Sequence, residues 1–248
     1  MFNELENISN ISNVINRLVT KSSKPVFIII DGDRTLIPDD STIFFFKYLD
    51  LEFNDLKIIF QKYGYSFEAF HNVALYYSKI EKEKYTNACN FSADSVEIYP
   101  EFKFFIHSVK EIAELILITS GIKQIWKSII DKNSIEFMHL IGGNYFPEDS
   151  FIVDRNAKGI IANALRKAGK TVFAFGDTLI DYDMLSEANH SYLVVNEKMN
   201  KDFIPYANEI RHLEQLSFLG VLHPNLKHTN LSEIRKLIQK YNHDISHR

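Results

Sequence analysis

Apolar residues follow two alternating patterns along the chain. Short continuous apolar runs are typical of buried strands. These runs lie at residues 26–31, 115–119, 137–143, 172–177 and 191–196. Elsewhere apolar residues recur every three or four positions, which predicts helices. The predicted helices span residues 4–19, 108–115, 122–130, 158–169 and 231–241. Together the two patterns predict an α/β fold, with an open parallel sheet flanked by helices.

Residues 38–104 interrupt this alternation. They are rich in aromatic residues, helical in period, and contain no run typical of a strand. We therefore expect a small α-helical cap at 38–104, inserted after the first strand, and a core formed by residues 1–37 and 105–248. Most of the cap's aromatic side chains are expected to pack on one another. Three of them are candidates to line a cleft: Phe67, Phe70 and Tyr77.

Composition and charge narrow the class of protein. The chain of 248 residues is 46% hydrophobic with a net charge of −4, which gives no reason to expect a nucleic-acid partner. The single cysteine, Cys89, cannot form an internal disulfide, and no apolar run approaches the roughly 18 residues that span a bilayer. The polar, acidic first residues are unlike a secretory signal peptide. We therefore expect a cytoplasmic protein that does not bind membranes.

Acidic residues follow two of the predicted strands. Asp31 and Asp33 end the first apolar run with Gly32 between them, while Asp177 ends the fourth run and Asp181 follows four residues later. The carboxyl ends of parallel strands meet at one edge of a sheet, so these acids are expected to converge. Such a cluster repels itself unless a cation neutralises it, and oxygen ligands suit Mg²⁺. The acids therefore predict a magnesium site.

Two further features suit a phosphate group beside that metal. Thr119 ends a strand and is followed by Ser120 and Gly121, so a hydroxyl and backbone N–H groups are available for phosphate oxygens. Lys158 lies near the start of a predicted helix, where the helix dipole disfavours a cation. A lysine in that position is expected to face an anion.

At this point the chain resembles a known family. The ordered segments DGDRT, ILITSG, AKG and GDTLID resemble the four motifs of the haloacid dehalogenase superfamily, over roughly residues 25–196. More narrowly, the chain is similar to the phosphoserine-phosphatase-like branch, whose helical cap lies between the first and second motifs. The resemblance depends on the order and strand-end position of all four motifs, because Asp-Gly-Asp alone is a common turn. It implies a Rossmann-like core carrying a small helical cap.

The resemblance also implies catalytic roles. Asp31 corresponds to the nucleophile that becomes an aspartyl phosphate. Asp33 corresponds to the acid that protonates the leaving oxygen and then activates the hydrolytic water. Thr119 matches the hydroxyl that holds phosphoryl oxygens, and Lys158 matches the cation that offsets charge on nucleophile and phosphate.

For the metal, the resemblance implies a Mg²⁺ ion held by Asp31, the backbone carbonyl of Asp33, and Asp177. Asp181 is expected either to bind this metal through water or to orient Lys158. Both roles remain open from the sequence.

Four further residues are candidate substrate contacts: Arg34, Asp40, Ser120 and Gly121. Asp40 lies nine residues after Asp31, where phosphoserine phosphatases usually have a glutamate. The aspartate argues against phosphoserine as the substrate.

These features predict a Mg²⁺-dependent phosphomonoesterase that acts on a small phosphorylated metabolite through an aspartyl phosphate. Asp33 separates the chain from the superfamily's dehalogenases, which lack this second acid and need no metal. Two alternatives remain. A phosphotransferase or phosphomutase would share all four motifs, and a non-catalytic sensor of a phosphorylated ligand would keep the fold. The presence of Asp31, Asp33, Lys158 and Asp177 argues against the sensor.

Overall fold

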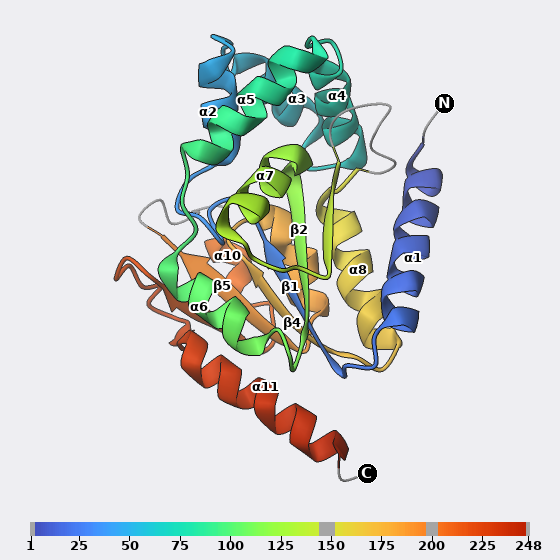
Figure 1. The fold of residues 1–248 in the computed structure, drawn as a ribbon, viewed down its shortest axis with the longest axis vertical. Coiled ribbons are helices and arrows are strands. Elements are labelled where there is room, and N and C mark those ends of the chain that lie inside the picture. Colours follow the sequence, from blue (N-terminus) through green and yellow to red (C-terminus); the bar gives the residue numbers. More distant parts are fainter. Residues whose placement is uncertain (1–2, 144–151, 197–202, 247–248) are drawn as a thin grey trace.

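Seven parallel strands form a single sheet in the computed structural model, which describes residues 3–143, 152–196 and 203–246 (Figure 1). Their order across the sheet is β3-β2-β1-β4-β5-β6-β7. The strands are β1 (Val26–Asp31), β2 (Glu114–Ile122), β3 (His139–Gly143), β4 (Thr171–Gly176), β5 (His190–Val195), β6 (Leu213–Ser217) and β7 (Lys227–His228). The predicted α/β fold with a parallel sheet is confirmed, and β6 and β7 are additions that the apolar pattern did not predict.

The first strand lies inside the sheet, between β2 and β4, and all six of its residues are buried. In register, Ile29 lies opposite Ile116 on β2 and Ala174 on β4. Because every pairing is parallel, the carboxyl ends of these strands share one edge, where ligand sites of open α/β sheets lie.

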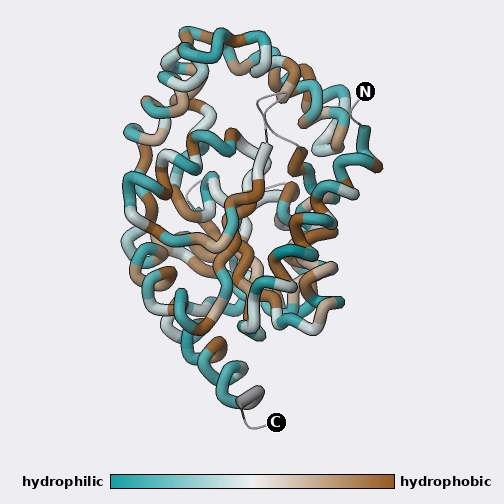
Figure 2. The backbone as a smooth tube through the Cα atoms, turned by 45° about the vertical axis from the view of Figure 1, so that its right-hand side comes forward, coloured by the Kyte–Doolittle hydropathy of each residue, from teal (hydrophilic) through white to brown (hydrophobic). Residues whose placement is uncertain are grey.

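Helices cover both faces of the sheet (Figure 1). One face packs against α1 (Glu4–Lys21), α8 (Arg155–Lys167), α9 (Tyr182–Glu187) and α10 (Ile204–Ala207). The other packs against α6 (Pro100–Val109), α7 (Lys123–Asn133) and α11 (Leu231–Ser246). Figure 2 shows hydrophobic residues along the central strands and mixed positions along the surrounding helices, as expected for amphipathic helices on a buried sheet. No helix among the described residues is long and apolar enough to cross a membrane.

The helix predicted at residues 108–115 is wrong. The observed helix α6 begins at Pro100, which has no N–H to leave unpaired in the first turn, and ends at Val109. Phe102, Phe105 and Val109 lie on its buried face. A turn then leads into β2, which begins at Glu114.

Four helices occupy most of the predicted cap and lie together at one end of the molecule (Figure 1). They are α2 (Ser41–Tyr48), α3 (Asn54–Tyr63), α4 (Phe67–Tyr77) and α5 (Lys82–Asp94). Aromatic rings join them, since Phe45 contacts Tyr77 and Tyr85 edge to face. The division at residues 104 and 105 stays a prediction, and α6 crosses it while packing against α11 and β4. We therefore propose that the cap ends before Pro100.

Candidate active site

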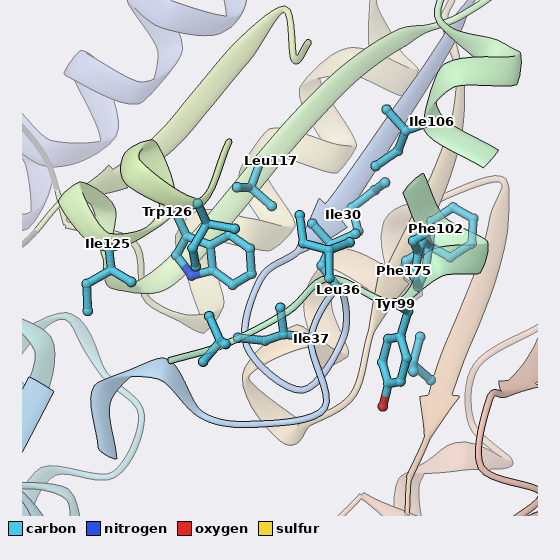
Figure 3. Packing of buried hydrophobic residues seen from close by; sticks show 14 of the residues in the cluster. Ile30, Leu36, Ile37, Tyr99, Phe102, Ile106, Leu117, Ile125, Trp126 and Phe175 are labelled. Carbon is cyan, nitrogen blue, oxygen red and sulfur yellow. The ribbon is translucent and has the colours of Figure 1, made fainter. Parts of the chain in front are cut away.

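Apolar side chains pack against one another and hold the loop after β1 in place. Leu36 and Ile37 are fully buried beside Ile30 of β1 and the ring of Trp126 (Figure 3). The N–H of Leu36 donates to the carbonyl of Gly32 at 2.8 Å, which closes a tight turn around the acids. A Cβ on Gly32 would lie 2.3 Å from the Trp126 ring, so only glycine fits there. This packing fixes the two acids at the edge of the sheet.

Lys158 joins two of the predicted acids at the base of the site. Its Nζ lies 2.5 Å from Asp31 Oδ1 and 2.6 Å from Asp181 Oδ1, and the side chain is 1% exposed. Burial alone would lower the pKa of Lys158, but the two carboxylates outweigh burial and raise it above its ordinary value. The lysine is therefore charged, although α8 begins only three residues earlier.

Asp181 uses both of its oxygens. Oδ1 accepts from Lys158, while Oδ2 accepts from the backbone N–H groups of Asp177 and Thr178 at 3.1 Å and 3.0 Å. These bonds anchor the loop after β4 and aim the carboxylate at the lysine. Of the two roles expected for Asp181, the geometry favours the orientation of Lys158.

Three buried acids form a group able to hold a cation. Asp31, Asp177 and Asp181 each offer an oxygen, and these oxygens lie within 4.8 Å of one another. Burial, together with the charge of Asp181, raises the pKa of Asp31 to about 7 against the opposing effect of Lys158. Burial also raises the pKa of Asp177 well above its ordinary value. A set of buried carboxylates whose ionised forms are disfavoured fits a divalent cation such as Mg²⁺.

The side chain of Asp33 lies apart from that group. Its Oδ1 accepts from the N–H of Ser41 at 2.7 Å, and its Oδ2 accepts from Trp126 Nε1 at 3.3 Å. Burial, followed by the charge of Asp40, raises the pKa of Asp33 to about 6. A carboxyl with this pKa exchanges a proton near neutral pH, as a general acid must.

Arg34 and Asp40 form a pair at the cavity. The Nε of Arg34 donates to Asp177 Oδ2 at 3.0 Å, and its Nη1 donates to Asp40 Oδ2 at 3.2 Å. Asp40 also caps α2, because its Oδ1 accepts from the N–H of Thr42 at 3.1 Å. Arg34 has a φ of 61°, in the left-handed region that side chains other than glycine seldom adopt. Both candidate contacts are therefore present, with their charges already paired inside the protein.

The segment after Ile118 continues as strand rather than ending at Thr119. β2 extends to Ile122, with an irregular register beyond Ile118. Thr119 is buried and its Oγ1 accepts from the N–H of Gly121 at 2.9 Å. Ser120 Oγ is buried and has no hydrogen-bond partner among the described residues. A Cβ on Gly121 would lie 2.7 Å from Asp33 Oδ2, so this position accepts only glycine without a shift.

These residues meet at one cavity of about 330 Å³. We call its charged side the core wall, formed by Asp31, Asp33, Arg34, Asp40, Thr119, Ser120, Gly121, Lys158 and Asp177. We call the opposite side the cap wall, formed by Phe53, Leu56, Phe60, Tyr65, Phe70, Val73 and Tyr77. All the predicted site residues line the cavity except Asp181, which lies behind Lys158. Of the three aromatic candidates, Phe70 and Tyr77 line the cavity and Phe67 does not.

Two contributors to the site were not predicted from the sequence. The apolar pattern indicated only a core position for Trp126, yet its indole N–H donates to Asp33. A buried tryptophan usually finds a partner for this group, which is the signal that could have raised the question. Thr35 is fully buried, with Oγ1 3.4 Å from Asp177 Oδ1.

Comparison with solved structures finds the same fold in several phosphoserine phosphatases. One, in a structure of an analogue of its phospho-aspartyl intermediate, has a TM-score of 0.58 at 17% identity, over 87% of this chain and 99% of that chain. A substrate-bound phosphoserine phosphatase has a TM-score of 0.56 at 16% identity, over 87% and 99%. The phosphoserine phosphatase from T. onnurineus has a TM-score of 0.52 at 16% identity, over 87% and 95%. At these identities the similarity shows a shared fold.

Comparison of the sequence itself gives the family. No curated protein matches the chain. The family model for haloacid dehalogenase-like hydrolases matches residues 28–186, which is more than half of the chain and includes all four motifs. The predictions of this superfamily and of an enzyme are thereby confirmed, and the chain belongs to the haloacid dehalogenase-like hydrolase family.

Proposed function

We propose that the protein is a cytoplasmic, Mg²⁺-dependent phosphomonoesterase that hydrolyses a small phosphorylated metabolite through an aspartyl phosphate on Asp31. The observation that carries this proposal is the buried Asp31–Lys158–Asp181 arrangement at the base of a cavity, with Asp33 beside it. The structural relatives support it, since the three reported above are phosphoserine phosphatases and one is named for a phospho-aspartyl intermediate analogue.

Asp31 and Asp177, with the backbone carbonyl of Asp33, are the groups we expect to hold the metal. When bound, Mg²⁺ would offset the charge of the carboxylates and of the phosphoryl oxygens, which otherwise repel one another. Asp181 is left to orient Lys158, because it bonds that lysine directly and, unlike Asp31 and Asp177, does not line the cavity.

In the first half of the reaction, a carboxylate oxygen of Asp31 attacks phosphorus and the bond from phosphorus to the ester oxygen breaks. Asp33 in its protonated form gives its proton to the departing alkoxide, so that an alcohol leaves. Its pKa of about 6 makes a useful fraction of the carboxyl protonated near neutral pH. Lys158 holds Asp31 in position and offsets the charge that gathers on the phosphoryl group.

In the second half, Asp33 is ionised and takes a proton from a water molecule, whose oxygen attacks the phosphorus of the aspartyl phosphate. The acyl phosphate bond breaks, inorganic phosphate leaves, and Asp31 regains its carboxylate while Asp33 regains its proton. Thr119 and Ser120 line the cavity, and their hydroxyl groups would donate hydrogen bonds to the phosphoryl oxygens. Ser120 is suited to this role because its buried Oγ has no partner among the described residues.

The test is phosphate release from a panel of phosphate monoesters, with Mg²⁺ and with EDTA, for the wild-type protein and Asp31→Asn. We expect Mg²⁺-dependent release that is abolished in the folded variant. Wild-type activity in Asp31→Asn would refute the nucleophile. Phosphorylated acceptor in place of free phosphate would indicate a transferase or mutase, and Mg²⁺-dependent binding without turnover would indicate a sensor.

A further inference from the structure

The two walls of the cavity differ in the chemistry that they offer to a substrate. In the part of the chain that the structure describes, the charged side chains that line the cavity come from the core, apart from Asp40, which precedes the first cap helix and is paired with Arg34 of the core. Among the described residues, none of the lining side chains contributed by residues 53–77 carries a charge, and all except the two tyrosines are purely hydrocarbon. The phosphate end of a substrate therefore meets charges, and its organic end meets hydrocarbon.

The cap wall is preformed by contacts between its own rings. Phe60 meets Phe70 edge to face, with the ring centres 5.2 Å apart, and lies 5.7 Å from the ring of Tyr65. Phe70 also packs with Ile152 and Ile180, which belong to the core side of the cleft. Ring pairs at these distances stabilise one arrangement of the side chains. The apolar wall is thus ready before a ligand binds.

The charged groups beside the cap wall are already hydrogen-bonded within the protein. Arg34 bonds to Asp177 and Asp40, and Asp40 bonds to Arg34 and to the N–H of Thr42. Among the described residues, an ammonium or carboxylate group on the organic end of a substrate would lose water against this wall and meet no unpaired side chain of opposite charge. Burying such a charge without a partner is costly, whereas burying apolar carbon is favourable.

We propose that the substrate is the phosphate monoester of an alcohol whose body is uncharged, apolar and about the size of one ring, seated against the cap wall. This inference rests on the proposed phosphatase function and names its substrate class. The cavity of about 330 Å³ lies at the lower end of the range for small-molecule sites, which fits a phosphate with one ring.

The test compares phenethyl phosphate with phosphoethanolamine, which carry a phenyl ring and an ammonium group on the same phosphorylated ethyl chain. Both are unactivated alkyl esters, so a difference reflects binding to the cap wall. We expect kcat/KM to be about a hundredfold higher for phenethyl phosphate. Equal values, or a preference for phosphoethanolamine or phosphoserine, would overturn the proposal.

Matched variants locate the effect. Phe60→Ala is expected to lower the preference for phenethyl phosphate about tenfold, because it removes the ring that joins Tyr65 and Phe70. Phe91→Ala is the control, since Phe91 is a partly exposed ring of α5 outside the cavity, and it should leave the preference unchanged. Phe60→Leu replaces Phe60→Ala if that variant unfolds. An unchanged preference in folded Phe60 variants would overturn the assignment to this wall.

A binding measurement separates this inference from the proposed function. The probes are phenylpropylphosphonate and aminopropylphosphonate, which cannot be hydrolysed at the C–P bond. Tighter binding of the phenyl compound to a protein that releases no phosphate would support the inference and reject the phosphatase. Equal binding of the two compounds would reject the inference even if phosphate release is observed.

Discussion

The core wall of the cavity is charged and hydrogen-bonded, whereas the cap wall opposite it is apolar and held by ring contacts. On the core wall, single atoms are fixed by bonds such as those from Lys158 to Asp31 and Asp181, at 2.5 Å and 2.6 Å. On the cap wall, the part of the chain that the structure describes shows no bond of that kind, and packing of rings such as Phe60 on Phe70 fixes the positions instead. Under the proposed function, the reaction chemistry lies on one wall and the choice of organic group on the other.

The two walls also differ in their effect on stability. Burial raises the pKa values of Asp31, Asp33 and Asp177, which shows that ionising these groups in the folded chain is unfavourable. The cap wall instead removes apolar surface from water, which is favourable. Removing a partner of these buried charges therefore leaves a carboxylate uncompensated, which costs more than truncating an apolar side chain of the cap wall. The following predictions test that order.

The largest effect is expected for Lys158→Met. This change removes the only cation bonded to Asp31 and Asp181 among the described contacts and leaves two carboxylates buried without it. We expect loss of detectable turnover and a decrease in the free energy of unfolding of about 3–5 kcal/mol. Denaturant unfolding and phosphate release measure the two effects.

A double variant separates the structural effect from the chemical one. Lys158→Met with Asp181→Asn removes one buried negative charge together with the lysine, so much of the lost stability should return while turnover stays absent. A double variant as unstable as Lys158→Met would contradict the view that unpaired charge is the cause.

A smaller effect is expected for Gly121→Ala, which tests whether the core wall can accommodate an added methyl group without displacing Asp33. The new Cβ would lie 2.7 Å from Asp33 Oδ2 and 3.1 Å from Thr119 Oγ1. We expect kcat to fall about 10- to 100-fold, because a displacement of the acid misaligns proton transfer. Gly169→Ala is the control, since it strains a backbone with φ of 80° while its Cβ would meet no atom within 4 Å, and Gly169 does not line the cavity. Equal activity losses in the two variants would show that general strain, rather than the position of Asp33, is responsible.

A smaller effect again is expected where α1 supports the junction of the two walls. The side chain of Asn7 is 2% exposed, donates to the carbonyl of Ile152 at 2.9 Å and accepts from its N–H at 2.6 Å. Ile152 packs in turn on Phe70 of the cap wall. Asn7→Ala should lower the free energy of unfolding by about 2 kcal/mol. The exposed Asn13 of the same helix is the control, and Asn13→Ala should change stability by less than about 0.5 kcal/mol in the same denaturant titration.

The sequence predicted the core wall far better than the cap wall, for a physical reason. Asp31, Asp33 and Asp177 follow buried strands directly, and the parallel order of the strands brings their ends together whatever the loops do. The local sequence pattern was therefore sufficient to predict that these acids converge. The pattern could not predict the hydrogen bond from Arg34 to Asp177, because this bond depends on a left-handed backbone at Arg34 and on a residue 143 positions away.

The cap wall depends on how helices rotate against one another, which local pattern does not specify. Phe67 and Phe70 are three residues apart on α4 and were equal candidates, yet only Phe70 lines the cavity. The strand β6 was missed because Glu214 and Gln215 interrupt its apolar residues, and Gln215 is buried through bonds to the loop carbonyls of His223 and Leu226. In each case, contacts distant in sequence decide the outcome.

The smallest predicted effect compares one histidine of the core with one of the cap. His190 of β5 stacks on Phe173 with ring centres 4.5 Å apart, and its Nε2 lies 2.9 Å from the hydroxyl of Tyr241. Burial lowers the pKa of His190, while the charges of Glu214 and His212 act in opposite directions. Burial also lowers the pKa of His71, which stacks on Phe67 at 5.5 Å in the cap.

A lowered pKa means that the unfolded chain binds the proton more tightly than the folded one. The stabilising contribution is therefore complete above the ordinary pKa of about 6.5 and is lost as pH falls through the folded value, with a slope of at most about 1.4 kcal/mol per pH unit for each group. Thermal unfolding from pH 7.5 to 5 measures this slope.

Because His190 lies against the sheet and α11, whereas His71 lies on a cap helix, His190→Asn should flatten the acid side of the stability curve more than His71→Asn. A larger change from His71→Asn would show that the cap histidine contributes more than the core histidine to the pH dependence of stability, which contradicts the prediction.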